Sequence, residues 1–157
     1  MIPKIKKILY ATDLSQNSAY VFNYALNSAE MHDAKIDILY VAPPIHDAVP
    51  DVMAGYVQYD PNDKSAASLK IKKRLDDFVQ LELKDNPDKV KRVSSIQVIA
   101  GNPVVEILDK ADELKAEVII MGTHSKGLIA HTFLGSVATN VLQRTKIPVF
   151  IIPIPKA

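Results

Sequence analysis

The chain has 157 residues, a formal net charge of +1 and no cysteine. One domain spanning 1–157 can bury roughly 70% of its unfolded surface, and the lack of cysteine excludes thiolate catalysis and zinc–cysteine sites. The balanced charge gives no field that would attract nucleic acid, and no apolar run reaches the roughly 20 residues that span a bilayer. With no recognisable secretory signal, we expect a cytoplasmic protein without nucleic-acid or membrane partners.

Five short apolar runs have the length of β-strands. They are continuous rather than alternating, which is typical of strands covered on both faces in a parallel sheet. In chain order the runs are Ile8–Ala11, Ile36–Val41, Ile96–Ile99, Val118–Met121 and Val149–Ile152.

Between these runs, apolar residues recur at helical spacing. The predicted apolar faces are Phe22, Ala25, Leu26 and Ala29; Ile71, Leu75, Phe78 and Val79; Val104, Ile107, Leu108 and Ala111; and Val137, Ala138, Val141 and Leu142. We expect Ser15 to cap the first helix and Asn102 to cap the third, which then begins with a proline. Asp85–Pro87 should close the second helix, because the residue before a proline avoids helical dihedrals.

The alternation of strands and helices predicts an α/β fold: an open five-stranded parallel sheet with helices on both faces. For five strands the common order is 3-2-1-4-5, which places the first strand beside the fourth. Ligands bind such sheets beyond the carboxyl ends of the strands, where the strand order reverses. The polar segments 12–15 and 122–127 follow those two strands, so the sequence predicts one cleft there. The long connection 43–63 has no clear period, as is common for functional lids or for partly disordered segments.

The segment 122–136 has a composition that suits phosphate. Glycines let backbone N–H groups approach a ligand, and Gly135-Ser136 precedes a helix whose N-terminus carries partial positive charge. Further donors in the segment are Thr123, Ser125, Lys126 and Ser136. The residues alone leave a structural alternative open, in which Gly122 only ends a strand, Gly135 eases entry to the helix and Ser136 caps it. The segment matches neither a Walker A loop nor G-x-G-x-x-G.

Several long segments share one resemblance. KKILYATDLS, IDILYVA, AGNPVVEILDKADELKAEVIIMGTH and LGSVATNVLQRTKIPVFIIP resemble the strands, turns and helices of the universal stress protein family, over nearly the whole chain. The resemblance implies the adenine nucleotide alpha hydrolase-like version of the predicted fold.

Nucleotide-binding members of that family carry glycine, two residues, glycine, nine residues, glycine and then serine or threonine. Gly122, Gly135 and Ser136 match this pattern, whereas Ser125 stands at the second glycine. The resemblance implies binding of ATP, ADP or AMP, with Mg²⁺ held mostly by phosphate oxygens. The nucleotide-binding residues that it implies are Ala11, Thr12, Asp13, Val41, Met121, Gly122, Thr123, His124, Ser125, Lys126, Gly127, Leu128, Gly135, Ser136, Val137 and Ala138.

Within this set, the resemblance places Asp13 near the nucleotide, the backbone of Val41 at the adenine, and the segments 122–128 and 136–138 around the phosphates. For Asp13 the residues alone also allow a helix cap. We interpret His124 and His131 as solvated or phosphate-facing, so no protein metal site is predicted.

The leading hypothesis is a homodimeric ATP-binding regulatory protein with little or no catalysis. The resemblance implies pairing of two copies through Val149–Ile152, an apolar strand whose exposed edge would invite a partner. One alternative is a dimeric stress or adaptor protein that binds no nucleotide, which Ser125 favours. Another is a slow ATPase, in which Lys126 and Mg²⁺ would stabilise the transferred charge.

Overall fold

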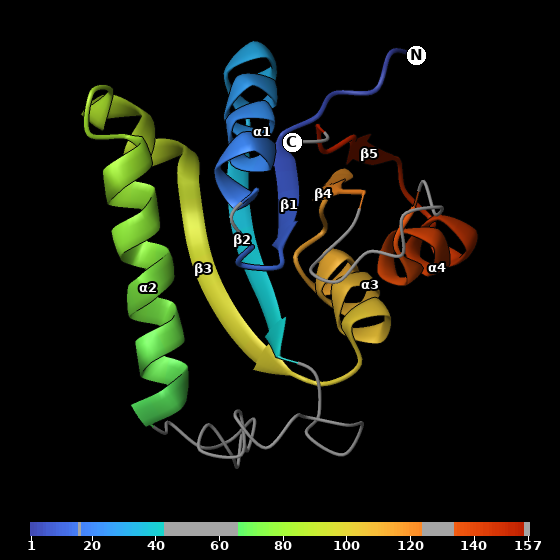
Figure 1. Cartoon of the computed structure of the whole chain (residues 1–157). Helices are drawn as coiled ribbons and strands as arrows, with labels where there is room; N and C mark the ends of the chain where they lie inside the picture. The colour runs from blue at the N-terminus through green and yellow to red at the C-terminus, as the bar shows by residue number, and fades with distance from the viewer. Residues whose placement is uncertain (16, 43–65, 124–133, 156–157) are drawn as a thin grey trace.

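The computed structural model describes residues 1–15, 17–42, 66–123 and 134–155. Helices and strands alternate along the chain (Figure 1). The elements are β1 (Lys7–Thr12), α1 (Ser18–His32), β2 (Lys35–Ala42), α2 (Ala66–Glu82), the 3₁₀ helix η2 (Pro87–Arg92), β3 (Val93–Ala100), α3 (Pro103–Glu113), β4 (Val118–Gly122), α4 (Ser136–Arg144) and β5 (Val149–Ile152). All five predicted strands are confirmed, and the predicted connection 43–63 lies outside the described residues.

The strands form one parallel sheet in the order β3-β2-β1-β4-β5, as predicted. The central strand β1 pairs with β2 on one side and with β4 on the other, so that Ile8 lies opposite both Ile36 and Val118. The chain order reverses at this point, because β2 and β3 build outward from one side of β1 and β4 and β5 from the other. The carboxyl ends of β1 and β4 therefore flank the switch point of the sheet.

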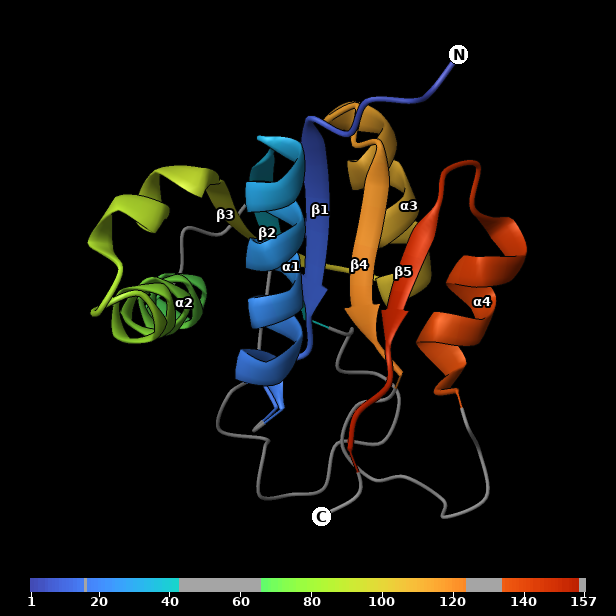
Figure 2. The same ribbon diagram turned by 90° about the horizontal axis from the view of Figure 1, so that it is seen from above.

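Helices cover both faces of the sheet: α1 and α2 lie on one face, and α3 and α4 on the other (Figure 2). Successive residues of β1 serve opposite layers, since Ile8 and Tyr10 pack with α1 and α2, whereas Leu9 packs with α3 and α4. All three side chains are at most 1% exposed. Full burial of such a side chain contributes about 1.5–3 kcal/mol, so β1 holds the two layers together. No helix within the described ranges is long and apolar enough to cross a bilayer.

The start of α3 is as predicted and the start of α1 is not. The Asn102 side chain accepts hydrogen bonds from the amides of Val104 (3.0 Å) and Val105 (3.2 Å), and so caps α3. The predicted cap at Ser15 is wrong, because α1 begins only at Ser18, after Asn17. The Ser15 hydroxyl instead accepts from the Asn17 amide (3.3 Å) and its carbonyl from the Ser18 amide (3.0 Å). Ser15 therefore shapes the turn that leads into the helix.

Two further details differ from the sequence prediction. The second helix ends at Glu82, before the predicted stop at Asp85–Pro87, and the chain then turns into η2. Leu142, expected on the apolar face of α4, is 40% exposed, although Ala138 and Val141 pack against the sheet. Among the strands that the structure describes, β5 is the last of the sheet, and none lies beyond it to cover Leu142.

Candidate functional site

A cleft of about 400 Å³ opens at the carboxyl ends of β1 and β4. From β1 the chain continues into α1 on one face of the sheet, whereas α4, the helix that follows β4, lies on the other face. The connections therefore diverge at the switch point and leave space between them, as is usual in open parallel sheets. The volume lies in the range of small-molecule binding pockets.

The structure brings together all the predicted nucleotide-binding residues that it describes. Those that line the cleft are Ala11, Thr12, Asp13, Val41, Met121, Gly122, Thr123, Gly135, Ser136, Val137 and Ala138. The other predicted residues lie outside the described part of the chain: His124, Ser125, Lys126, Gly127 and Leu128.

Ser15, which belongs to the predicted cleft segment 12–15, also lines the cleft. Several lining residues were missed by the sequence analysis: Tyr10, Asn17, Ser18, Val21, Leu39, Tyr40, Pro103, Ile107 and Ile154. Pro103 and Ile107 could have been found, because they lie one turn apart at the start of a helix that begins at the same edge of the sheet. Ile154 carries no sequence signal, since its position depends on the path of the chain after β5.

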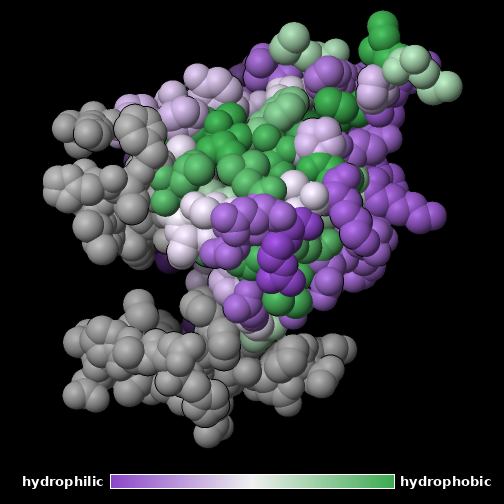
Figure 3. All heavy atoms as spheres, turned by 90° about the vertical axis from the view of Figure 1, so that its right-hand side faces the viewer, coloured by the Kyte–Doolittle hydropathy of each residue, from purple (hydrophilic) through white to green (hydrophobic). Residues whose placement is uncertain are grey.

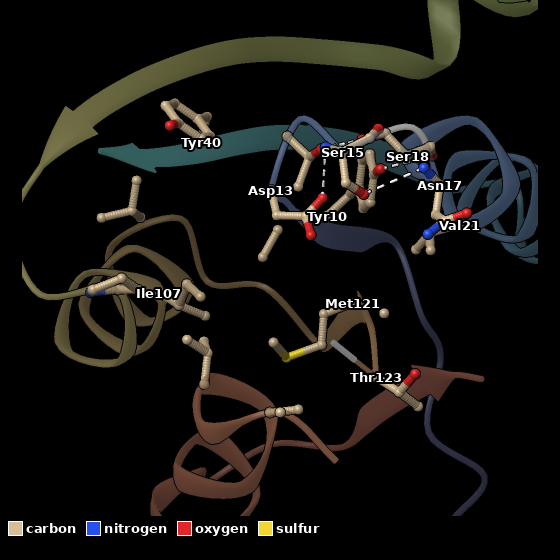
Figure 4. Close-up of a pocket in the computed structure, with 18 of the residues that line it drawn as sticks. Tyr10, Asp13, Ser15, Asn17, Ser18, Val21, Tyr40, Ile107, Met121 and Thr123 are labelled. Atoms are coloured by element: carbon tan, nitrogen blue, oxygen red, sulfur yellow. Dashed lines mark hydrogen bonds between the residues drawn. The ribbon is translucent and has the colours of Figure 1, made fainter. Parts of the chain in front are cut away.

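The turn after β1 directs Asp13 into the cleft. The Asp13 carboxylate accepts a hydrogen bond from the Ser15 amide through Oδ1 (2.9 Å), and no described residue donates to its second oxygen. Figure 4 shows this carboxylate and the Met121 side chain on opposite sides of one open space. Asp13 thus closes a turn rather than capping α1, which begins at Ser18. Among the described lining residues it is the only charged side chain.

Leu14 has a left-handed backbone, with φ of 58°. That conformation costs a residue with a side chain roughly 1–2 kcal/mol. Two contacts hold it: the Leu14 amide donates to Oγ1 of Thr12 (3.2 Å), and the Leu14 side chain packs on the core beneath α1 and α2. The turn therefore separates neighbouring side chains, with Asp13 at the cleft and Leu14 in the core.

A network of buried hydroxyl groups also holds the turn after β1 in place. The Tyr10 hydroxyl donates to the carbonyl of Ser18 (2.9 Å), and the Ser18 hydroxyl donates to the carbonyl of Ser15 (2.7 Å). Oγ1 of Thr12 lies 3.3 Å from Oγ of Ser18. Burial raises the pKa of the Tyr10 phenol above its ordinary value, so the phenol remains a protonated donor. A fully bonded network of this kind makes the cleft floor rigid.

The N-terminus of α4 lies at the cleft, and its first amides have no partner among the described residues. Gly135 precedes the helix with φ of −65° and ψ of 162° and offers no side chain to cap it. No described residue accepts a hydrogen bond from the amides of Ser136, Val137 or Ala138, and all three residues line the cleft. Such an end carries about half a positive charge and is a ready site for an anion. The structural alternative that made Ser136 the cap is wrong, because Gly135 occupies that position.

Among the described residues, no group of three or more His, Asp or Glu side chains is arranged to hold a metal ion. The cleft thus has the N-terminus of α4 at one end, a carboxylate at the turn after β1, and apolar walls from Leu39, Val41 and Ile107. These features define an open parallel α/β domain with a cleft beyond the carboxyl edge of its sheet, where proteins of this architecture bind ligands.

The chain belongs to the universal stress protein family, whose model matches residues 4–153. Universal stress protein MJ0577 of Methanocaldococcus jannaschii is 24% identical over 94% of this chain and 94% of its own length. Its solved structure superposes with a TM-score of 0.70 at 20% identity, covering 99% of this chain and 100% of that one.

Two other solved structures share the fold and contain nucleotides. A universal stress protein in complex with cAMP has a TM-score of 0.58 at 22% identity, covering 98% of this chain and 100% of that one. The universal stress protein of Archaeoglobus fulgidus in complex with dAMP has a TM-score of 0.61 at 19% identity, covering 96% of this chain and 99% of that one. These likenesses establish the shared fold.

Proposed function

We propose that this protein binds an adenine nucleotide, foremost ATP, in the cleft between β1 and β4, and acts as a regulatory protein with little or no catalysis. The observation that carries the proposal is the set of amides at Ser136–Ala138, which donate to no described residue and belong to residues that line a cleft large enough for a nucleotide. The cAMP and dAMP complexes of two proteins with this fold support the choice of an adenine nucleotide.

Charge gives the ligand an orientation in the cleft. Phosphates favour the positive end of α4 and avoid the Asp13 carboxylate, so Asp13 faces the nucleoside, whose hydroxyl and amino groups can donate hydrogen bonds. The base then lies toward β2, between the apolar side chains of Val41 and Ile107. In this orientation Met121 lies between the two halves of the ligand.

Magnesium would enter the site with the phosphates. Since no described cluster is arranged to hold a metal by itself, Mg²⁺ would be bound mainly by phosphate oxygens, as it usually is with nucleotides.

We further propose that two copies pair through β5 and that the protein works in the cytoplasm. β5 is an edge strand, and Phe150 on it is 37% exposed. Figure 3 views this side of the molecule and shows apolar side chains gathered in a patch bordered by polar ones. An unpaired apolar edge favours strand-to-strand association. Sedimentation of wild type and Phe150→Lys tests this, with a dimer expected for the wild type and a monomer for the variant.

Calorimetric titration of about 0.1 mM protein with ATP and magnesium tests nucleotide binding. We expect one ATP per chain, and an absence of heat in several buffers would contradict the proposal. Ser125, at the second motif glycine, supports the alternative of an adaptor that binds no nucleotide. That alternative predicts that Ser125→Gly gains binding which the wild type lacks. Intact ATP after long incubation would exclude the slow ATPase.

A further inference from the structure

The chain returns to the cleft after leaving β5. The Ile154 amide donates to Oγ1 of Thr123 (3.2 Å), and the Thr123 amide donates to the carbonyl of Ile152 (3.1 Å). Thr123 also accepts from the Gly135 amide through its carbonyl (2.5 Å). One buried threonine therefore joins the end of β4, the start of α4 and the segment 153–155.

Ile154 is packed into the wall of the cleft. Its side chain lines the cleft and packs on the core beneath α1. A Cβ atom on Gly122 would lie 3.1 Å from Cδ1 of Ile154 and 3.2 Å from Cγ2 of Val21, which is tighter than ordinary packing. The backbone of Gly122 is not left-handed. The first motif glycine thus leaves room for Ile154 beside β4.

Strand order places Ile154 at the phosphate end of the cleft. β5 neighbours β4, whereas Val41 at the nucleoside end lies on β2, on the other side of β1. The Ile154 side chain packs on the α1 face of the sheet, and its amide is joined through Thr123 to Gly135 at the start of α4. An apolar side chain at this end of the cleft excludes water, and hydrogen bonds to a charged group are stronger where water is excluded.

We propose that Ile154 is a ligand-contacting residue that closes the phosphate end of the cleft, and that Thr123 is the positioning residue that holds it there. The inference rests on the proposed function and adds to it a wall that the glycine motif does not contain. It also gives the segment after the edge strand a direct part in binding.

Matched isoleucines test the contact. Ile154 and Ile5 are both half-buried against the same core, but Ile5 does not line the cleft. Ile154→Ala should weaken the binding of ATP roughly tenfold and that of AMP less, because the side chain that is removed shields the phosphates from water. Ile5→Ala should lower stability similarly and leave both affinities unchanged. Equal ATP affinity in wild type and Ile154→Ala would overturn the inference, whereas a wild type that binds no ATP would overturn the proposed function and this inference with it.

Matched threonines test the positioning role. Oγ1 of Thr145 accepts the Ile147 amide (3.1 Å) in the turn before β5, which is the same contact away from the cleft. Thr123→Val should weaken ATP binding roughly threefold, and Thr145→Val should leave it unchanged. In the wild type, ATP should shift the NMR signal of the Ile154 δ-methyl and leave that of Ile5 in place. This measurement needs no variant, and an unmoved Ile154 methyl at saturating ATP would overturn the inference.

Discussion

Two helices that begin at the same edge of the sheet treat their first amides in opposite ways. α3 closes its own end, because the Asn102 side chain accepts from Val104 and Val105 and a proline occupies the first helical position. α4 follows Gly135, which has no side chain, and no described residue accepts from its first three amides. Both helices line the cleft, and this difference is the reason for assigning the phosphates of the proposed ligand to the α4 end.

The comparison assigns different tasks to the two caps. The cap of α3 contributes stability of about 1 kcal/mol, the usual value for an asparagine in that position. The start of α4 lacks a side-chain cap and that gain, and under the proposed function its donors serve the ligand. An unpaired polar group costs little while water reaches it, and it becomes a strong partner once a phosphate arrives.

The largest effect is expected from giving α4 a cap of its own. In Gly135→Asp the new carboxylate would accept from the free amides and repel phosphate, which should lower ATP affinity about 100-fold. Asn102→Asp places the same charge at the α3 cap, where the amides are already bonded, and should change affinity less than threefold. Calorimetry on both variants measures this, and equal losses would indicate a general charge effect.

Removing one amide from α4 should have the next largest effect. Ser136→Pro deletes an N–H at the first helical position, where proline is well tolerated, and Gly135 already has the extended backbone that precedes a proline. We expect ATP affinity to fall about tenfold. In Ser136→Ala, which keeps the amide and loses the hydroxyl, ATP affinity should fall much less. If the alanine variant loses as much ATP affinity as the proline variant, the hydroxyl and not the amide donates to the ligand.

Opening α3 should affect stability alone. Asn102→Ala removes the acceptor of the Val104 and Val105 amides and should cost about 1 kcal/mol. For a chain of this size the melting temperature should fall by about 2–4 °C. ATP affinity should stay as in the wild type. A clear loss of affinity would show that the α3 end also serves the ligand.

The smallest effect concerns two backbone amides at the opposite edge of the sheet, which donate to a carboxylate. Glu117 accepts from the amides of Lys6 and Lys7, and these bonds lower its pKa below 4.5. Its stabilisation is therefore complete above about pH 4.5 and is lost as the pH falls through the lowered pKa of the folded state. Unfolding curves of wild type and Glu117→Gln should differ at pH 7 and converge as the pH falls through the lowered pKa of Glu117. A constant difference would contradict this role.

Elements set by local chemistry were predictable from the sequence. The strands follow from continuous apolar runs, and the α3 start follows from Asn102-Pro103. The position of the cleft followed from strand order, because polar turns after the first and fourth strands must meet at the switch point.

The parts that were missed depend on contacts between distant segments. Ile154 lies at the cleft through contacts with distant segments, among them its bond to Thr123, 31 positions earlier, and its packing on the core. Ser15 was predicted as a cap from its residue type, yet the left-handed Leu14 and the turn that follows delay the start of α1 to Ser18. Leu142 fits the helical period but lies beyond the last strand. Residue type and spacing carry no information on these paths.

The central claim is that the free amides of α4 hold the phosphates, and NMR amide shifts during titration with ATP test it most directly. The account predicts that the signals of Ser136, Val137 and Ala138 move most, and that those of Val104 and Val105, already bonded to Asn102, move much less. Saturating ATP that leaves the three α4 amides in place would contradict the account.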